Sequence, residues 1–564
     1  MLISKRLRHR LPFLSWPRPD RSLLRSEVFA GLSVGLMVIP QGVAYAALAG
    51  MPLVTGIYAS LLPALVAVLF SASTRLSVGP TALTAMLVSA SLTGMAEPGS
   101  AQWVNLAVWL SLLTGLLQIV LGFARFGWLL NLVSSPVLTA FTQGAAVIII
   151  SSQLPALLGL TQGWSSLTDL GSLSGPSLAF GLATLAILMV TKRLRPTFPT
   201  VLVVVVGAAA ISGALNLQAQ GVAVVGDLPQ GLPALYLPQL PSWDVLKQLV
   251  LPTLVITLVS FLETASSAKV DNERKGQRWD QDQDLIGQGL GKLASALCGA
   301  FPTSSSFSRS ALNLYAGAQT GWATVVSVVV ILLALLLFIP VLHHVPQSVL
   351  SAIVVAAVLG LLKPRAFTRL LRINRVEGIT ALLTFGITLA SAPRLYWGVL
   401  AGVVMGLSHF LHTRLHPRII EVGLHPDGSL RARHLWKLPP LAAHLYALRM
   451  DAELDFAAAS GLERAITEHL ATHPDVRHVC LFAQPINRID VTGVETFAQI
   501  RRQLAAHRIT LHISGIKLPV ETALRRADEL DNDPLLQMYR TDTEALQALR
   551  QLTPQPADMA AAAI

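Results

Sequence analysis

The sequence predicts a polytopic α-helical membrane protein with a small α/β domain after its last membrane segment. Three observations lead to this prediction. Apolar residues make up 53% of the 564 residues and charged residues only 13%, against about a quarter in soluble domains. The mean hydropathy is positive, at +0.58. Charged residues gather at positions 1–27, in short loops and after position 412, so we expect the middle of the chain to lie in a bilayer.

The predicted membrane region, residues 28–412, follows a basic cytoplasmic stretch, residues 1–27. That stretch superficially resembles a signal peptide, but the apolar run behind it is too long, so we predict a retained first membrane segment. A membrane helix needs about 20 apolar residues, fewer if it is broken. On that rule we predict fourteen segments, near 28–48, 56–71, 78–95, 103–123, 132–151, 177–191, 199–215, 247–269, 285–300, 303–318, 320–341, 347–362, 376–391 and 394–412.

The charges of the loops support this count, because Lys and Arg favour the cytoplasmic side of the inner (plasma) membrane. If the N-terminus is cytoplasmic, the loops on that side hold fourteen Lys and Arg residues and the opposite loops hold only Lys247 and Arg394. An even number of crossings then puts both termini in the cytoplasm. The same distribution explains the net charge of +11 without a nucleic-acid partner.

The composition changes after residue 412. We expect a linker over 413–439, a cytoplasmic α/β domain over 440–553 and a flexible tail over 554–564. Short apolar runs predict strands at 445–450, 476–482 and 510–514, and helical patterns predict helices near 456–471, 491–506 and 519–529. About 115 residues suffice for such a domain.

Two short membrane segments, the third and the tenth, begin alike. Each has a proline at the first helical turn, and the separation of Pro80 and Pro302 along the chain equals that of Gln41 and Glu263. Together with the seven-plus-seven division, this predicts two inverted repeats. The N-termini of the third and tenth helices would meet near the midplane, where two positive dipole ends form an anion site.

Glu263 follows an apolar stretch, so its carboxylate is expected inside the membrane, where such groups are costly and usually functional. It could bind a proton, or it could hold Na⁺ with hydroxyls such as those of Thr264 and Ser267. The alternative is a structural ion pair with Lys292 of the ninth segment.

Hydroxyl groups crowd the predicted helix starts, with Thr81 in the third segment and Thr303 to Ser306 and Ser308 in the tenth. They could replace the hydration of an anion, or they could pack helices closely. Arg309 could add positive potential or extend to the cytoplasmic face. Gln41 and Tyr45 could line the pocket or pack between helices. We expect no cofactor and no metal site.

These residues also resemble the sulfate permease family of anion transporters. The likeness covers roughly 20–553, and it is carried by Pro40 to Gly50, Gly56 to Ser60, Ser77 to Ala82, Phe301 to Thr303 and Phe307 to Ser310. The resemblance implies fourteen segments in two inverted repeats, a core of segments 1–4 and 8–11, a gate of segments 5–7 and 12–14, an elevator movement, and a homodimer.

The resemblance also assigns roles to single residues. It implies a substrate site at Gln41, Tyr45, Thr81, Ser306 and Ser308, with Glu263 as the coupling carboxylate and Arg309 as the basic residue behind the site. Lys292 departs from the asparagine expected in many members, and an ammonium close to Glu263 would hold that carboxylate ionised.

The C-terminal domain resembles a STAS domain. Residues 487–493 match the strand-to-helix loop of that fold, where a helix N-terminus favours phosphate or nucleotide binding in relatives. Asp490 and Thr492 are therefore candidate regulatory residues, and the alternative is that Thr492 only starts the helix.

Several functions fit this reading, and none is that of an enzyme. The first is secondary active transport of a small inorganic anion, most simply sulfate entering with H⁺. Na⁺-coupled bicarbonate uptake and H⁺-coupled dicarboxylate uptake are rivals within transport. A membrane-anchored STAS signalling protein and an anion channel are the alternatives from other classes.

Overall fold

The computed structural model describes residues 10–160, 174–194, 198–229, 231–276, 278–337, 339–530 and 533–552. The predicted tail, 554–564, lies outside the described residues. The chain forms two compact units, Met1–Gly406 and Leu407–Ile564.

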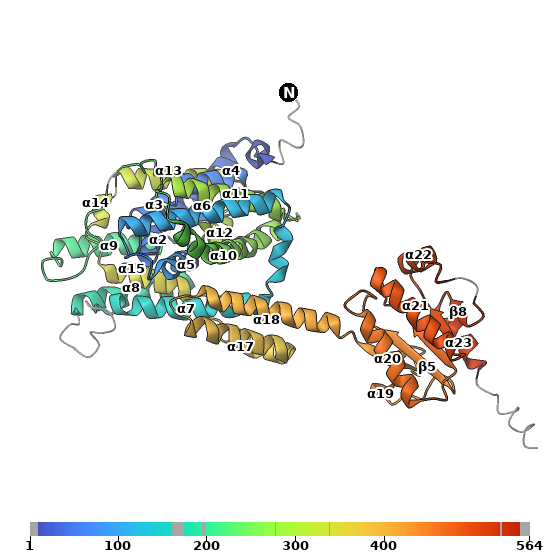
Figure 1. Ribbon diagram of the computed structural model, residues 1–564. Coiled ribbons are helices and arrows are strands. Elements are labelled where there is room, and N and C mark those ends of the chain that lie inside the picture. Colours follow the sequence, from blue (N-terminus) through green and yellow to red (C-terminus); the bar gives the residue numbers. More distant parts are fainter. Residues whose placement is uncertain are drawn as a thin grey trace, which may run out of the picture. The chain divides into compact units, whose positions relative to one another are not determined.

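Helices dominate the first unit, and each of the fourteen predicted membrane segments contains one (Figure 1). Five of the described helices are long and apolar enough to cross a membrane on those criteria alone. The first half contains α2 (Arg21–Leu48), α3 (Thr55–Tyr58), α4 (Leu62–Phe70), α5 (Ala82–Leu92), α6 (Ala101–Phe123), α7 (Ser135–Leu157), α8 (Gly175–Leu194) and α9 (Thr200–Ala214). The second half contains α10 (Trp243–Lys275), α11 (Gln281–Leu297), α12 (Phe307–Tyr315), α13 (Trp322–Leu337), α14 (Ile339–Leu342), α15 (Gln347–Leu359), α16 (Arg365–Ile373), α17 (Arg375–Ala390) and α18 (Tyr396–Leu415).

These helices pack in two groups that match the predicted core and gate. In the first group, α2 packs on α13, and α11 packs on α4 and α6. In the second, α7 packs on α15 and α17, and α8 packs on α15. In Figure 1, α4, α6, α11 and α13 gather on one side of the unit and α7, α8 and α15 on the other. The helices of the two repeats therefore interleave within each group, as an inverted repeat requires.

Glycines allow the closest contacts in the first group. A Cβ on Gly31 would lie 2.4 Å from the carbonyl oxygen of Ala323, and one on Gly115 would lie 2.8 Å from that of Gly289. Helix pairs in membranes approach closely through such small residues. The close packing fixes where the third and tenth segments meet.

The second unit is built around a six-stranded sheet with the order β4-β3-β5-β6-β7-β8. Neighbours from β5 to β8 are parallel, and β3 runs antiparallel to β4 and β5. The strands are β3 (Ile419–Leu424), β4 (Leu430–Ala432), β5 (Leu445–Met450), β6 (His478–Phe482), β7 (Thr510–Ser514) and β8 (Leu536–Tyr539), and the helices are α19 (Arg433–Trp436), α20 (Ala459–Thr472), α21 (Val491–Ala506), α22 (Leu518–Arg526) and α23 (Asp542–Arg550).

The three predicted strands and three predicted helices of this unit have counterparts within a few residues. The predicted linker, 413–439, differs, because it contains β3, β4 and α19. Glu421 interrupts the apolar pattern of β3, and in the fold Arg433 donates to its carboxylate at 2.5 Å. This ion pair stabilises a charged residue within β3. Because the charged residue breaks the apolar pattern, that pattern did not predict the strand.

Candidate functional site

A short β-ribbon joins the starts of the third and tenth segments. Its strands are β1 (Val78–Gly79) and β2 (Ser304–Ser305), which pair antiparallel with Val78 opposite Ser305. The ribbon continues on one side, where the Ser306 amide donates to the Ser77 carbonyl at 3.0 Å. Two segments from different halves of the sequence are thereby fixed side by side, with a helix following each strand.

The two helices that follow the ribbon begin at hydroxyl residues. Thr81 caps α5 and accepts from the Thr84 amide at 3.3 Å, and Ser306 caps α12 and accepts from the Arg309 amide at 3.5 Å. Both caps are neutral, so the positive ends of the two helices are not compensated by a carboxylate cap. Not every hydroxyl expected in the first turn of the tenth helix is there, because Thr303 to Ser305 precede α12 and lie in β2 or the residue before it.

Glu263 on α10 reaches the cap of α5. Its Oε2 accepts hydrogen bonds from Thr81 Oγ1 at 3.1 Å and from Thr84 Oγ1 at 3.2 Å. Thr84 is not among the residues predicted from the sequence. A signal was present, because Thr81 and Thr84 are three positions apart and therefore on the same face of a helix.

Lys292 is fully buried, yet it forms no ion pair with Glu263 among the residues that the structure describes. Its Nζ donates instead to Gln118 Oε1 at 2.9 Å. The Gln118 amide donates to Ser260 Oγ at 3.0 Å, one turn before Glu263. In the described structure Lys292 and Glu263 thus interact electrostatically but not as a direct ion pair. The lysine belongs to a hydrogen-bonded chain that reaches α10 through Gln118.

Arg309 is also fully buried, and its side chain turns back toward the ribbon. Nε donates to Ser77 Oγ at 3.2 Å and Nη1 donates to the Pro80 carbonyl at 2.9 Å. Nη2 has no hydrogen-bond partner within the described part of the chain. The guanidinium is thus held beside the start of α5 and does not extend to a membrane face, and one of its donor groups remains available.

Gln41 and Tyr45 lie one turn apart on α2, with 3% and 5% of their surfaces exposed. Tyr45 lies within electrostatic range of both Arg309 and Glu263. Gln41 Oε1 is buried without a partner in the described ranges. The structure therefore brings Tyr45, Thr81, Glu263 and Arg309 together, and Gln41 keeps an unused acceptor nearby on the same helix.

Ser306 and Ser308 stand apart from that group. Their hydroxyls lie 3.3 Å from each other, and Ser308 is exposed. Neither hydroxyl contacts Glu263 or the Arg309 guanidinium in the described structure. Of the six predicted substrate-site residues, Ser308 is thus the most peripheral.

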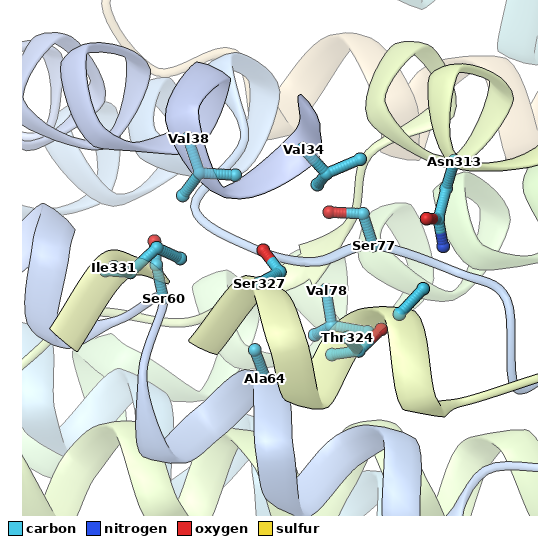
Figure 2. A pocket seen from close by; sticks show the side chains of 11 residues that line it. Val34, Val38, Ser60, Ala64, Ser77, Val78, Asn313, Thr324, Ser327 and Ile331 are labelled. Carbon is cyan, nitrogen blue, oxygen red and sulfur yellow. The ribbon is translucent and has the colours of Figure 1, made fainter. Parts of the chain in front are cut away.

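A small cavity lined by both polar and apolar side chains lies next to the ribbon (Figure 2). It leaves about 10 Å³ for the centre of a water molecule, which is room for about one. Ser77 and Asn313 line it, and the buried Asn313 Oδ1 has no partner among the described residues. Val34 and Val38 of α2 lie on one side and Thr324, Ser327 and Ile331 of α13 on another. Gln41, Tyr45, Thr81 and Glu263 do not line this cavity.

The candidate regulatory residues lie in the second unit. Asp490 caps α21, and its carboxylate accepts from the Gly493 amide at 2.8 Å and from the Phe456 amide at 2.9 Å. Thr492 is exposed in the first turn of the helix. The Asp490 carboxylate thus caps the start of α21, and Thr492 is accessible to solvent.

The fold and the geometry of the site define the class of protein as a multi-pass membrane protein with a buried polar centre between two short opposed helices. Residues 24–384 match the sulfate permease family and residues 442–545 match the STAS domain. The first match covers more than half of the chain, so the chain belongs to the sulfate permease family.

Individual relatives agree. The chain is 31% identical to a probable sulfate transporter of Mycobacterium tuberculosis, over 94% of this chain and 96% of that one. It is 31% identical to probable sulfate transporter 4.2 of Arabidopsis thaliana, over 92% and 80%. The murine solute carrier 26 family member A9 anion transporter in its inward-facing state has a similar fold, with a TM-score of 0.85 at 19% identity over 96% of this chain and 94% of that one. The structural likeness shows the fold, and the family match with the two probable sulfate transporters supports anion transport for this chain.

Proposed function

We propose that this protein takes up sulfate together with H⁺ across the inner (plasma) membrane, with both termini and the STAS domain in the cytoplasm. Relatives that carry the name sulfate transporter, at 31% identity over most of the chain, support the substrate. The homodimer and the elevator movement of core against gate remain part of this proposal. The division of the first unit into two helical groups is compatible with such a movement.

One observation carries the proposed coupling. The Thr81 hydroxyl serves two groups at once, because it caps α5 and donates to the Glu263 carboxylate. An ionised Glu263 therefore directs this hydroxyl away from any anion at the start of α5. The ionised carboxylate also places a negative charge beside that position, and this charge repels a bound anion.

Protonation of Glu263 reverses both effects. The charge disappears, and Thr81 Oγ1 can accept from the new carboxyl O–H while its own proton turns toward an anion. The free amides of the first turn of α5, the equivalent amides of α12 and the unused Nη2 of Arg309 then supply donors and positive potential. Tyr45 and Gln41 would wall the anion on the side of α2. Sulfate would thus bind with the proton, as symport requires.

The test is uptake of labelled sulfate into proteoliposomes under an inward proton gradient. The parent should accumulate sulfate, and Glu263→Gln should lose the gradient-driven part while folding normally. Glu97→Gln is the matched control, because Glu97 is an exposed glutamate. Accumulation driven by an Na⁺ gradient instead would contradict the proposed coupling ion. Uptake of bicarbonate or succinate in place of sulfate would contradict the proposed substrate. Gradient-driven accumulation that survives in Glu263→Gln would remove Glu263 from the mechanism.

A further inference from the structure

The short helix α16 separates its charged and apolar side chains. Arg365, Arg369 and Arg372 are spaced by four and three positions, so they share one face of the helix. Ala366, Phe367, Leu370 and Leu371 occupy the opposite face, the pattern of an amphipathic helix. No residue of α16 is buried. The helix therefore offers a row of three accessible guanidinium groups.

Contacts with α17 fix the orientation of this row. The Phe367 and Phe385 rings meet edge to face, with centroids 5.4 Å apart. Leu371 covers Gly378 so closely that a Cβ there would lie 2.6 Å from Leu371 Cδ2. Because the apolar face of α16 is held against α17, the arginines must point away from it.

Further basic residues extend the row into a basic surface. Lys363 and Arg375 flank α16 and are exposed, and Lys192 of α8 lies at the end of α15, where its Nζ is 3.4 Å from the position of a Cβ on Gly360. We call Lys192, Lys363, Arg365, Arg369, Arg372 and Arg375 the basic surface.

The positive charge of the basic surface is not neutralised within the described part of the chain. No described carboxylate lies within ion-pair distance of the three arginines of α16. Glu377, the acidic residue next in sequence, instead accepts from the Asn374 side-chain amide at 3.4 Å. The guanidinium groups of the surface are therefore free to bind an external anion.

The position of α16 indicates which anion. It joins α15 and α17, which occupy two predicted membrane segments, so it lies where the chain leaves and re-enters the bilayer. Ile373 is 71% exposed and Val376 48% exposed directly beside the arginines. Exposed apolar side chains next to a row of arginines suit the boundary between acyl chains and headgroups. Guanidinium groups also match the geometry of phosphate oxygens.

We propose that the basic surface binds the phosphate headgroups of anionic phospholipids in the leaflet that it faces. Arg365, Arg369 and Arg372 would contact the phosphates, and Ile373 would enter the acyl region. This inference goes beyond transport and does not depend on which anion is carried.

The test measures lipid binding to the purified full chain by native mass spectrometry, with phosphatidylglycerol and phosphatidylcholine added separately. The parent should retain phosphatidylglycerol in preference to phosphatidylcholine. Replacing Arg365, Arg369 and Arg372 together by Gln should weaken the binding of phosphatidylglycerol by about 100-fold. The control replaces Arg464, Arg502 and Arg526 of the second unit by Gln, since these are also exposed and the net charge changes equally. It should bind as the parent does.

Three results would overturn the proposal. The first is that the triple Gln variant binds phosphatidylglycerol as tightly as its control, and the second is that the parent holds both lipids equally. The third is complete displacement of the lipid by free glycerol phosphate at the same concentration, which would mean a soluble phosphate ligand. If the Gln variant does not fold, the salt dependence of the parent protein tests the proposal. Its binding of phosphatidylglycerol must fall steeply between low and high salt, and binding that is independent of salt would contradict the proposal.

Discussion

Two helix N-termini in this protein both begin at a side-chain cap, but the caps differ in charge. In the first unit, α5 begins at the buried neutral cap Thr81, with the guanidinium of Arg309 at its side. In the second unit, α21 begins at Asp490, whose two carboxylate oxygens accept from the Gly493 and Phe456 amides. The start of α5 has a neutral cap, and the charge beside it depends on whether Glu263, which accepts from Thr81, is protonated. The start of α21 is neutralised permanently by its own capping carboxylate.

The difference shows why a helix N-terminus alone does not identify an anion site. An anionic cap occupies the position that a bound anion would take and repels it as well. A neutral cap beside a buried cation leaves that position to an anion once the neighbouring Glu263 is protonated. We therefore propose anion binding at the start of α5 and a structural role for the start of α21, and the following predictions test this proposal.

The largest effect is expected from Arg309→Gln. This change removes the buried charge beside α5 and leaves the Pro80 carbonyl and the Ser77 hydroxyl without their donors. Losing one partner of a buried charged contact costs several kcal/mol, so uptake should fall by about 100-fold or more. The measurement is the initial rate of sulfate uptake in proteoliposomes, with correct folding checked by size-exclusion chromatography. Arg309→Lys is the matched control and should keep part of the rate; equal loss in both would mean that geometry matters and charge does not.

A smaller effect is expected from Thr81→Ala. It removes both the cap and one donor to Glu263, and hydrogen bonds to charged groups contribute about 1.5–3 kcal/mol, so uptake should slow by about 10-fold to 100-fold. Thr84→Ala removes only a donor to the same oxygen and keeps the cap. It should therefore slow uptake less. If the two variants behave alike, the cap plays no part in binding the anion.

The sequence was sufficient to predict that the third and tenth segments begin alike, because Pro80 and Pro302 mark two similar helix starts, and the structure pairs these starts through β1 and β2. It was not sufficient to predict Ser77 as the partner of Arg309, since that contact arises only where β1 meets β2 from the other half of the sequence. The sequence could not predict which way the Arg309 side chain points either, because the packing of neighbouring elements decides this and residue spacing does not. In the second unit, the strands with clear apolar runs were predicted, whereas β3 was missed because Glu421 is stabilised by a distant arginine.

A third prediction concerns buried polar groups in the second unit. His512 hydrogen-bonds with His478 at 3.2 Å and with Tyr539 at 3.1 Å. Burial, reinforced by the neighbouring His478, lowers the pKa of His512 to about 4. Because the unfolded chain binds a proton at higher pH than the folded one, stability is present above the unfolded pKa of about 6.5 and is lost as pH falls toward 4.

The loss should amount to about 1–2 kcal/mol for the second unit, and it is measured by hydrogen exchange of the β7 amides in the full chain between pH 7 and pH 4.5. His512→Phe should flatten this dependence, whereas His507→Phe, which changes an exposed histidine, should leave it intact. A pH dependence that survives His512→Phe would locate the sensitive group elsewhere.

The smallest effect is expected from Asp490→Asn. Asparagine is about as good an N-cap as aspartate, so the second unit should lose only about 0.5–1 kcal/mol, chiefly from the weaker bond to the Phe456 amide. Sulfate uptake should not change, because the capping side chain of residue 490 occupies the start of α21 and this helix lies outside the proposed transport site. The measurement pairs thermal unfolding of the full chain with the initial rate of uptake. A fall in uptake without a fall in stability would give the Asp490 loop a regulatory role, and the contrast between the two helix starts would then be one of function and not only of charge.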